Sequence, residues 1–192
     1  MDEVYSYVVK SVRKPTKHKR VLFLCGASGT GKTTYASKFL EDAEMHTSYV
    51  YLNIDELGKV FPSIRRDAIP ELIVRATNDG YSVFVDATCR IRRTYVSIID
   101  DLLRKGYRIT MGVMYVPLET ALSRVASRSE QPIPERVVRD IYAHTKRNIE
   151  SYMHLPELFL YSNGRLVFQK NGESVTCPNP SAPFYFPLSK YC

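Results

Sequence analysis

The chain has 192 residues, which is enough for one good hydrophobic core and little more. Hydrophobic residues make up 44% of the chain and charged residues 24%, as in an ordinary soluble globular domain. No apolar run approaches the roughly 20 residues of a membrane helix, so we expect no membrane-spanning segment. The net charge of +7 favours polyanionic partners such as nucleic acid, although solubility alone would also account for it.

The start of the chain lacks the basic residues and apolar centre of a signal peptide. The cysteines are widely spaced and form neither a metal-ligand pair nor a dense disulfide framework: Cys25, Cys89, Cys177 and Cys192. We therefore assign the cysteines no role and expect a reducing cytoplasm, or the host cytoplasm if the chain is phage-encoded. The histidines have no metal-ligand spacing either, and they also receive no role.

The N-terminal residues 1–11 carry apolar side chains at near-helical spacing, which predicts a short helix. Residues 13–20 follow, and five of these eight are Lys or Arg. This basic segment is either a solvated entry to the first strand, which we favour slightly, or a patch that contacts phosphates.

The stretch from Gly26 to Thr33 reads GASGTGKT and fits the phosphate-binding pattern G-x-x-x-x-G-K-[ST]. It follows a continuous apolar run at residues 21–25, typical of a buried parallel strand, and precedes a predicted helix over residues 34–44. Glycines leave room for backbone N–H groups to turn inward around phosphate oxygens, and the helix start adds its dipole. Lys32 can reach the β- and γ-phosphates, and the Thr33 hydroxyl can bind Mg²⁺.

The alternative for this stretch is a glycine-rich turn before an ordinary helix. Because every fixed position matches between a strand and a helix, we favour a nucleotide site. We expect it to be formed by Gly26, Ser28, Gly29, Thr30, Gly31, Lys32, Thr33 and Thr34, with Arg124 from further along the chain.

The middle of the chain alternates strands with helices. Strands are predicted at residues 49–54, 81–85 and 108–116, and helices at residues 64–78, 93–105, 117–128 and 135–153. This alternation predicts an α/β fold in which right-handed crossovers build a parallel sheet between helical layers. Ligands of such sheets bind at the carboxyl ends of the strands, which predicts one rim formed by Gly26, Asp55, Asp86 and Pro117.

Two aspartates end predicted strands at this rim. Asp55 could accept a proton from an attacking hydroxyl, although an aspartate in an ordinary turn is equally common. Asp86 follows the apolar residues 83–85 and could hold Mg²⁺ behind Thr33, which we favour over a turn.

Arginines follow in two groups. Arg124 and Arg128 share a helix face before a loop with two prolines, which suits a lid that stabilises charge on a transferred phosphoryl group; a solvent-facing stripe is the alternative. Arg90, Arg92 and Arg93 follow Asp86 and either grip a phosphate-bearing acceptor or form a wet turn.

The C-terminal part differs from the rest. Residues 166–176 predict a β-hairpin with a type I′ turn at Asn171-Gly172. The remaining residues hold four prolines, at positions 178, 180, 183 and 187, among aromatic residues, which predicts an extended segment packed on the surface.

These motifs resemble those of the bacteriophage polynucleotide 5′-kinases and related small phosphate-loop kinases, over roughly residues 21–152. The resemblance rests on the phosphate loop, on Asn53-Ile54-Asp55-Glu56, on Val85-Asp86-Ala87-Thr88 with Arg92 and Arg93, and on Val116-Pro117 with Arg124, Arg128 and Pro134. It implies ATP and Mg²⁺ as cofactors, Asp55 as general base and Arg128 as the lid arginine. Where the family carries an acceptor-binding Arg, this chain has Gly58 beside Lys59, and Cys89 replaces the family's Asn.

The resemblance therefore implies an ATP-dependent kinase in which Lys32, Asp55 and Arg128 are catalytic. We expect Arg90, Arg92, Arg93 and Lys59 to bind the acceptor. The acceptor we favour is a hydroxyl on nucleic acid, preferably DNA, either a 5′-OH end or a hydroxymethylated base such as 5-hydroxymethyluracil. The alternatives are a small-molecule or nucleotide-sugar kinase, similar to zeta-type toxins, and a non-kinase nucleotide-binding regulator or ATPase.

We expect a single folded domain. Residues 1–20 form its basic N-terminal segment, residues 21–160 its kinase core with a lid near residues 118–140, and residues 161–192 a hairpin and proline-rich tail packed on the core.

Overall fold

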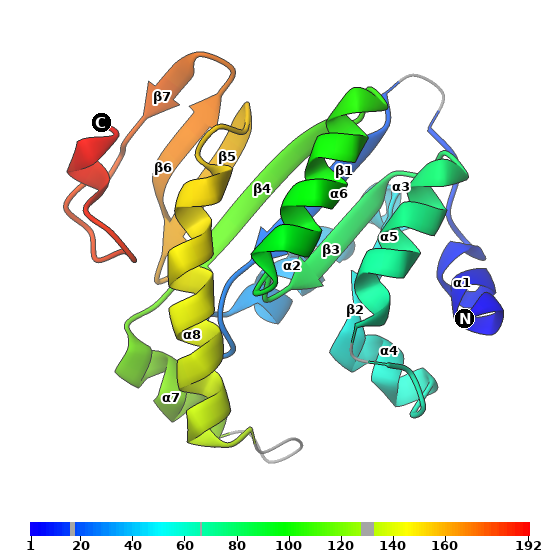
Figure 1. The fold of residues 1–192 in the computed structure, drawn as a ribbon, viewed down its shortest axis with the longest axis horizontal. Coiled ribbons are helices and arrows are strands. Elements are labelled where there is room, and N and C mark those ends of the chain that lie inside the picture. Colours follow the sequence, from blue (N-terminus) through cyan, green and yellow to red (C-terminus); the bar gives the residue numbers. More distant parts are fainter. Residues whose placement is uncertain (16–17, 66, 128–132) are drawn as a thin grey trace. The chain divides into compact units, whose positions relative to one another are not determined.

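The structure is a computed structural model, and it describes residues 1–15, 18–65, 67–127 and 133–192. In this part of the chain, seven strands form one sheet in the order β2-β3-β1-β4-β5-β6-β7 (Figure 1). The strands are β1 (Arg20–Cys25), β2 (Val50–Asn53), β3 (Val83–Ala87), β4 (Arg108–Tyr115), β5 (Glu157–Ser162), β6 (Arg165–Asn171) and β7 (Ser174–Thr176). The pairs β2–β3 and β4–β5 are parallel, and β5–β6 and β6–β7 are antiparallel. The predicted α/β class, with a mostly parallel sheet between helices, is confirmed.

Helices connect the strands. They are α1 (Asp2–Val9), α2 (Lys32–Leu40), α3 (Ala43–Ser48), α4 (Ile54–Val60), α5 (Ala68–Asn78), α6 (Arg92–Arg104), α7 (Leu118–Ala126) and α8 (Glu135–Ile149), with 3₁₀ turns at Glu150–Tyr152 and Leu188–Lys190. Among the described residues, every helix is too short or too polar to cross a membrane.

The chain divides into two compact units. The first comprises residues 1–23, 33–87 and 93–109, and the second comprises residues 24–32, 88–92 and 110–192. Strands β1 and β4 each contribute residues to both units.

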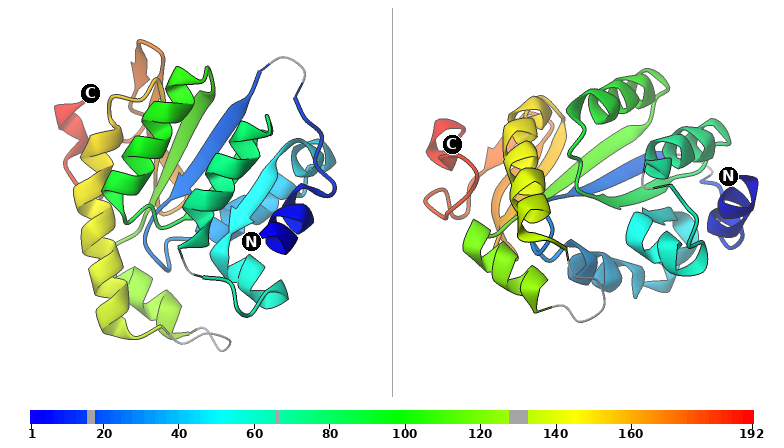
Figure 2. Two further views of the ribbon diagram at one scale, coloured as in Figure 1. Left: turned by 45° about the vertical axis from the view of Figure 1, so that its right-hand side comes forward. Right: turned by 60° about the horizontal axis from the view of Figure 1, so that its bottom comes forward.

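The first unit is built on β2 and β3. Helices α5 and α6 lie on one face of these strands, and α2 and α3 lie on the other (Figure 2). Apolar residues recur at helical spacing on α5, where Ile69, Leu72 and Ile73 are buried. The parallel register pairs Val50 with Val83 at one end and brings the last residue of β2 opposite Asp86 at the other.

The second unit contains the end of β1, most of β4 and all later elements. Helices α7 and α8 pack against each other. Strand β5 pairs along β4 from Thr110 opposite Glu157 to Tyr115 opposite Ser162. The C-terminal tail, red in Figure 1, lies beside β6, where the Asn179 side chain donates to the Leu166 carbonyl.

Strand β5 is an element that the sequence analysis missed. It joins β6 through Asn163 and Gly164, which have positive φ angles of 48° and 77°. Two consecutive residues of this kind form the type I′ turn, for which Asn-Gly is the preferred pair. The Asn-Gly pair was therefore a local signal for this hairpin.

The predicted hairpin of residues 166–176 is present as β6 and β7, but its turn was placed one residue too early. Asn171 pairs with Ser174, so Gly172 and Glu173 form the turn. Of these two residues only Gly172 has a positive φ, 63°, as in a turn with glycine at its first central position.

The predicted helix over residues 34–44 was also wrong in its extent, because two helices occupy this region. Helix α2 ends at Leu40, and Asp42 then starts α3 by accepting a hydrogen bond of 2.9 Å from the Glu44 N–H. A side-chain acceptor at this position satisfies the free donors of a helix start, which explains the new helix.

The four cysteines do have a structural role, contrary to the prediction. Cys25 is bonded to Cys89, and Cys177 to Cys192. Disulfides persist mainly in oxidising environments, so the argument for a reducing compartment loses its basis and the cytoplasmic location stays a prediction.

Gly164→Ala should destabilise the protein by about 1 kcal/mol, because a side chain disfavours the positive φ of this turn. Gly58→Ala is the control: Gly58 lies inside helix α4, where an added Cβ would meet no heavy atom within 4 Å apart from its chain neighbours and the helix's own backbone, so this alanine should be neutral or slightly stabilising. Chemical denaturation of both variants measures the difference. An equal unfolding free energy for Gly164→Ala and wild type would contradict the turn assignment.

Candidate active site

The predicted phosphate loop lies between β1 and α2, as the sequence analysis placed it. Its glycines allow very close backbone contacts. A Cβ added to Gly26 would lie 2.6 Å from the Met114 carbonyl oxygen, and one added to Gly29 would lie 2.4 Å from the Ala121 carbonyl oxygen. Both residues also have positive φ angles, 154° and 83°, so larger residues are excluded by space and by backbone conformation. The loop is thereby fixed against the end of β4 and against α7.

The Ala27 carbonyl organises the interior of the loop. It accepts hydrogen bonds of 2.9 Å from the Lys32 ammonium and 2.9 Å from the Thr30 hydroxyl. Thr30 is buried, whereas Ser28 and Lys32 are half-buried and Thr34 is exposed on the first turn of α2. The ammonium that is expected to meet the phosphates therefore lies within the loop that would cradle them.

Of the two arginines predicted to belong to the lid, the structure describes one. Arg124 on α7 lies beside the loop, where its guanidinium donates a hydrogen bond of 3.4 Å to the Gly29 carbonyl. Arg128 lies outside the described residues, so its role as the lid arginine stays a prediction.

The two residues predicted to bind Mg²⁺, Thr33 and Asp86, meet in the first unit. The Thr33 hydroxyl donates to Asp86 Oδ2 over 3.5 Å, at the long end of hydrogen-bond distances. The same oxygen accepts from the Asn53 side-chain amide at 2.7 Å and from the Tyr51 hydroxyl at 3.3 Å. Burial and the nearby Asp86 charge raise the pKa of Tyr51, which keeps its hydroxyl protonated as a donor.

A threonine hydroxyl beside a buried carboxylate fits Mg²⁺, which prefers hard oxygen ligands. Asp86 is only 3% exposed, so solvent screens its charge less than that of a surface carboxylate. Thr33 and Asp86 would hold the ion. Among the described residues, no group of three or more His, Cys, Asp or Glu side chains forms another metal site.

Asn53 connects this pair to Asp55. Its amide N–H₂ donates to Asp86, while its side-chain carbonyl accepts from the backbone N–H groups of Asp55, at 2.8 Å, and Glu56, at 3.1 Å. The carbonyl thereby caps α4, whose first turn carries Asp55 as an exposed residue. The prediction that Asp55 ends the strand is corrected: β2 ends at Asn53, because the asparagine cap starts a helix there.

Sequence reasoning assigned no function to Asn53 or Tyr51. An asparagine with two acidic residues in the turn that follows, here Asp55 and Glu56, is a typical helix start, so the cap was visible in the sequence. The contact with Asp86 was not visible, because it depends on the β2–β3 register.

The predicted acceptor-binding residues are all exposed. Lys59 pairs with Glu56 on α4 at 2.9 Å, and Arg90 pairs with Asp140 on α8 at 3.6 Å. Arg92 and Arg93 lie at the start of α6. None of these contacts tests acceptor binding, so the role of Arg90, Arg92, Arg93 and Lys59 stays a prediction.

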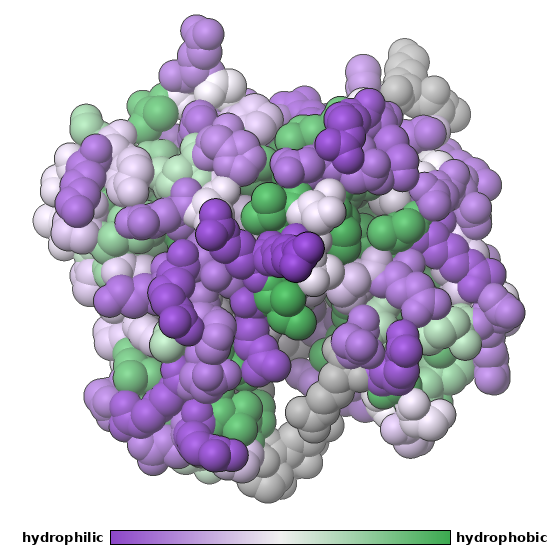
Figure 3. All heavy atoms as spheres, viewed as in Figure 1, coloured by the Kyte–Doolittle hydropathy of each residue, from purple (hydrophilic) through white to green (hydrophobic). Residues whose placement is uncertain are grey.

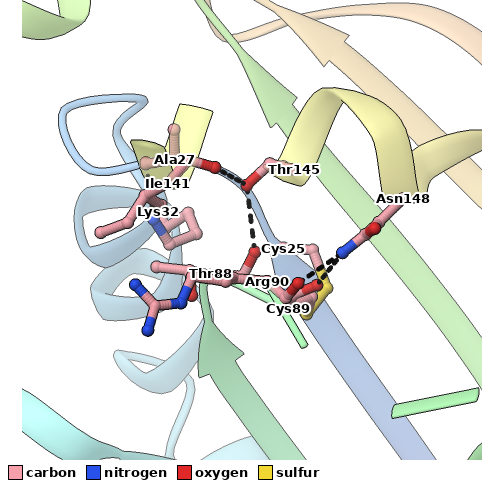
Figure 4. The surroundings of a disulfide bond; sticks show 9 residues. All are labelled: Cys25, Ala27, Lys32, Thr88, Cys89, Arg90, Ile141, Thr145 and Asn148. Carbon is pink, nitrogen blue, oxygen red and sulfur yellow. Dashed lines mark hydrogen bonds between the residues drawn. A yellow bond between two sulfur atoms is a disulfide. The ribbon is translucent and has the colours of Figure 1, made fainter. Parts of the chain in front are cut away.

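Helix α8 holds the loop that follows β3. The Thr145 hydroxyl donates to the Thr88 carbonyl, and the Asn148 amide donates to the carbonyls of Cys89 and Arg90 (Figure 4). Cys89 has a φ of 49°, uncommon for a residue other than glycine. Its disulfide joins this loop to Cys25, the residue directly before the phosphate loop.

Comparison with known proteins shows a family match over most of the chain. The Zeta toxin family profile matches residues 6–175. No curated protein matches the chain significantly.

Solved structures share the fold. The PezAT toxin–antitoxin system of Streptococcus pneumoniae matches with a TM-score of 0.60 and 17% identity, over 88% of this chain and 77% of that one. AvrRxo1-ORF1 with AvrRxo1-ORF2 and ATP matches with a TM-score of 0.66 and 17% identity, over 93% and 67%. The Pnkp1/Rnl/Hen1 RNA repair complex matches with a TM-score of 0.54 and 20% identity, over 71% and 47%. At these identities the likeness shows the fold alone, and polynucleotide specificity stays a prediction.

Replacing Cys25 and Cys89 together by serine should lower the free energy of unfolding by about 4 kcal/mol, because their bond closes a long loop in the unfolded chain. Their sequence separation is 64, against 15 for Cys177 and Cys192. The Cys177→Ser/Cys192→Ser variant is the matched control, with an expected loss of about 3 kcal/mol. Denaturation without reductant measures both. A Cys25/Cys89 variant as stable as wild type would contradict a stabilising role of this bond.

Proposed function

The chain belongs to the Zeta toxin family, and we propose that it transfers the γ-phosphate of ATP to an alcohol, with Asp55 as the general base. Family membership supports the phosphotransferase class and the use of a nucleotide. The acceptor and the residue roles are our inference.

One chain of contacts carries the proposal. It runs from the Thr33 hydroxyl to Asp86, from Asp86 to the Asn53 amide, and from the Asn53 carbonyl to the Asp55 backbone. The residue that ends the phosphate loop is thereby connected to the proposed base through one buried asparagine. The contact reaches the backbone of Asp55, so it fixes where α4 begins and therefore the place of the proposed base.

The loop residues would hold the triphosphate. Backbone N–H groups of the loop and the Lys32 ammonium bind its oxygens, and Arg124 supports the loop at Gly29. Mg²⁺ at Thr33 and Asp86 would neutralise negative charge on the phosphates. Arg128 would add a guanidinium from the lid.

Asp55 would accept the proton of the acceptor hydroxyl. As that proton moves to the carboxylate, the oxygen forms a bond to the γ-phosphorus and the bond to the bridging oxygen of ADP breaks. The products are a phosphate ester and ADP. Asp55 lies exposed on the first turn of α4, which leaves its carboxylate accessible to an acceptor.

Membership of the Zeta toxin family supports a small molecule or nucleotide sugar as our first candidate acceptor, since the sequence analysis connected these acceptors with zeta-type toxins. A hydroxyl on nucleic acid is the second candidate, and two observations favour it. The net charge is +7, and Arg90, Arg92 and Arg93 are exposed near one another in the chain. The face of the molecule drawn in Figure 3 is mainly hydrophilic, with apolar side chains in small separate groups.

Labelled phosphate from γ-labelled ATP identifies the acceptor. The panel contains nucleotide sugars, 5′-OH DNA, 5′-OH RNA and hydroxymethyluracil DNA, each tested at low and high salt. We expect label on a nucleotide sugar at a rate that varies little with salt. Label on nucleic acid that falls steeply with salt would select the second candidate, because phosphate contacts release counterions. ATP hydrolysis without any labelled acceptor would instead indicate a nucleotide-binding regulator or ATPase.

Asp55→Asn should lower phosphoryl transfer by about 10²–10⁴-fold and leave ATP binding nearly intact, since the change removes only the proton acceptor. Asp2→Asn is the control, because Asp2 also lies exposed in the first turn of a helix. Single-turnover transfer and ATP titration separate the two steps. Normal transfer by Asp55→Asn would rule out Asp55 as the base.

A further inference from the structure

We propose that the disulfide between Cys25 and Cys89 is a redox switch for the nucleotide site: the closed bond holds the phosphate loop ready for ATP, and reduction by a dithiol weakens ATP binding. The proposal rests on the nucleotide-binding role proposed above. It goes beyond that role because it makes ATP binding depend on the redox state of the protein. The bond has no part in the phosphoryl transfer itself.

One end of the bond is joined directly to the phosphate loop. Cys25 is the last residue of β1, and the next residue is Gly26, the first of the loop. Gly26 packs so closely on the Met114 carbonyl oxygen that an added Cβ would lie 2.6 Å from it. The Ala27 carbonyl then accepts a hydrogen bond from the Lys32 ammonium at 2.9 Å. The bond therefore restrains the chain two residues before the group that positions the lysine.

The other end of the bond lies in a loop that is held in an uncommon conformation. Cys89 has a φ of 49°, in the left-handed region that residues with a side chain disfavour. The Asn148 amide, on α8, donates to the Cys89 carbonyl at 3.2 Å and to the Arg90 carbonyl at 2.6 Å (Figure 4). The disulfide and the asparagine both hold this segment, and reduction removes the covalent restraint.

The closed bond thereby connects the phosphate loop to α8, within one compact unit that contains residues 24–32, 88–92 and 110–192. A second connection does not use the bond: Gly29 packs against the Ala121 backbone of α7, and α7 packs against α8. Reduction should therefore loosen the phosphate loop without releasing it. We expect weaker ATP binding rather than its complete loss.

The bond is buried, but the segment that carries it is at the surface. Cys25 and Cys89 are 1% and 2% exposed, so a reductant reaches the sulfurs only when this part of the chain opens locally. Arg90 and Ile91 follow Cys89 directly, and both are exposed. Local opening of exposed segments costs much less free energy than unfolding of the whole protein. The bond can therefore respond to a reductant while the protein stays folded.

Reduction transfers two electrons from the dithiol to the bond. A thiolate of the dithiol attacks one sulfur and forms a mixed disulfide, and the second thiol of the reagent then displaces the protein sulfur. Cys25 and Cys89 each gain one electron and one proton, and the dithiol becomes a disulfide. Oxidation by a disulfide reagent reverses these steps.

The bond and the nucleotide should influence each other. A phosphate loop that is already ordered loses less freedom when ATP binds, so the closed bond should raise the affinity. Coupling between two such events typically changes an affinity by about fivefold or more. Because coupling is reciprocal, bound ATP should make the bond harder to reduce by the same factor.

Calorimetric titration with ATP and Mg²⁺ compares the oxidised protein with the protein reduced by dithiothreitol. Alkylation of the new thiols followed by mass measurement identifies the reduced cysteines, and circular dichroism reports whether the reduced protein is folded. We expect the Kd for ATP to rise by about fivefold or more on reduction. In a buffer of reduced and oxidised dithiothreitol, saturating ATP should shift the equilibrium toward the closed bond by the same factor.

The second disulfide provides the matched control. The Cys177→Ser/Cys192→Ser variant keeps only the bond between Cys25 and Cys89, and it should retain the full response to dithiothreitol. The Cys25→Ser/Cys89→Ser variant should bind ATP as weakly as the reduced wild type and should not respond to the reductant. If this variant fails to fold, the first variant titrated with and without reductant still decides the question.

Equal ATP affinity before and after reduction would overturn the proposal, and so would a response that persists in Cys25→Ser/Cys89→Ser. A bond that opens only when the whole protein unfolds would also overturn it, because its role would then be purely structural. The titration needs no acceptor, so a protein that binds ATP but labels no acceptor contradicts the proposed kinase reaction alone. A protein that binds no ATP in either redox state would overturn both.

Discussion

The hydrogen bond between the Asn53 amide and Asp86, 2.7 Å long and buried, is the contact on which the proposed chemistry depends. An asparagine side chain donates and accepts at the same time, so one residue can bind a carboxylate and cap a helix. An aspartate at position 53 would keep the cap but place a second negative charge against Asp86, and an alanine would lose both bonds. The parallel register of β2 and β3 brings the two residues opposite each other, so the sheet itself sets this geometry.

The phosphate loop depends on a different constraint, which is the close packing of its glycines against the end of β4 and against α7. Gly26 and Gly29 contact backbone atoms of Met114 and Ala121 at distances that exclude a Cβ. Loops that bind phosphate must present backbone N–H groups in fixed directions, and a loop held against a strand and a helix loses little entropy when it does so. Tyr185 of the C-terminal tail packs its ring against that of Tyr115, the last residue of β4, at a centroid distance of 4.8 Å.

The two disulfides constrain two different parts of the chain. Cys25 directly precedes the phosphate loop, and Cys89 lies in the loop after β3, so their bond joins two segments of the second unit that flank the proposed site. The second bond, between Cys177 and Cys192, closes a loop that lies beyond the residues matched by the family profile. A disulfide stabilises a protein mainly by reducing the freedom of the unfolded chain, so the longer loop closed by Cys25 and Cys89 gives that bond the larger expected effect.

The sequence by itself determined the phosphate loop, the alternation of strands and helices, and the strand position of Asp86, because each depends on neighbouring residues: glycines where φ is positive, apolar runs where strands are buried. It also contained the Asn163-Gly164 turn, although strand β5 before it was missed. Only the tertiary structure decided the partners of Asn53, Cys25 and Tyr185. Those contacts join residues far apart in the chain, and they follow from sheet register and burial, which no local pattern encodes.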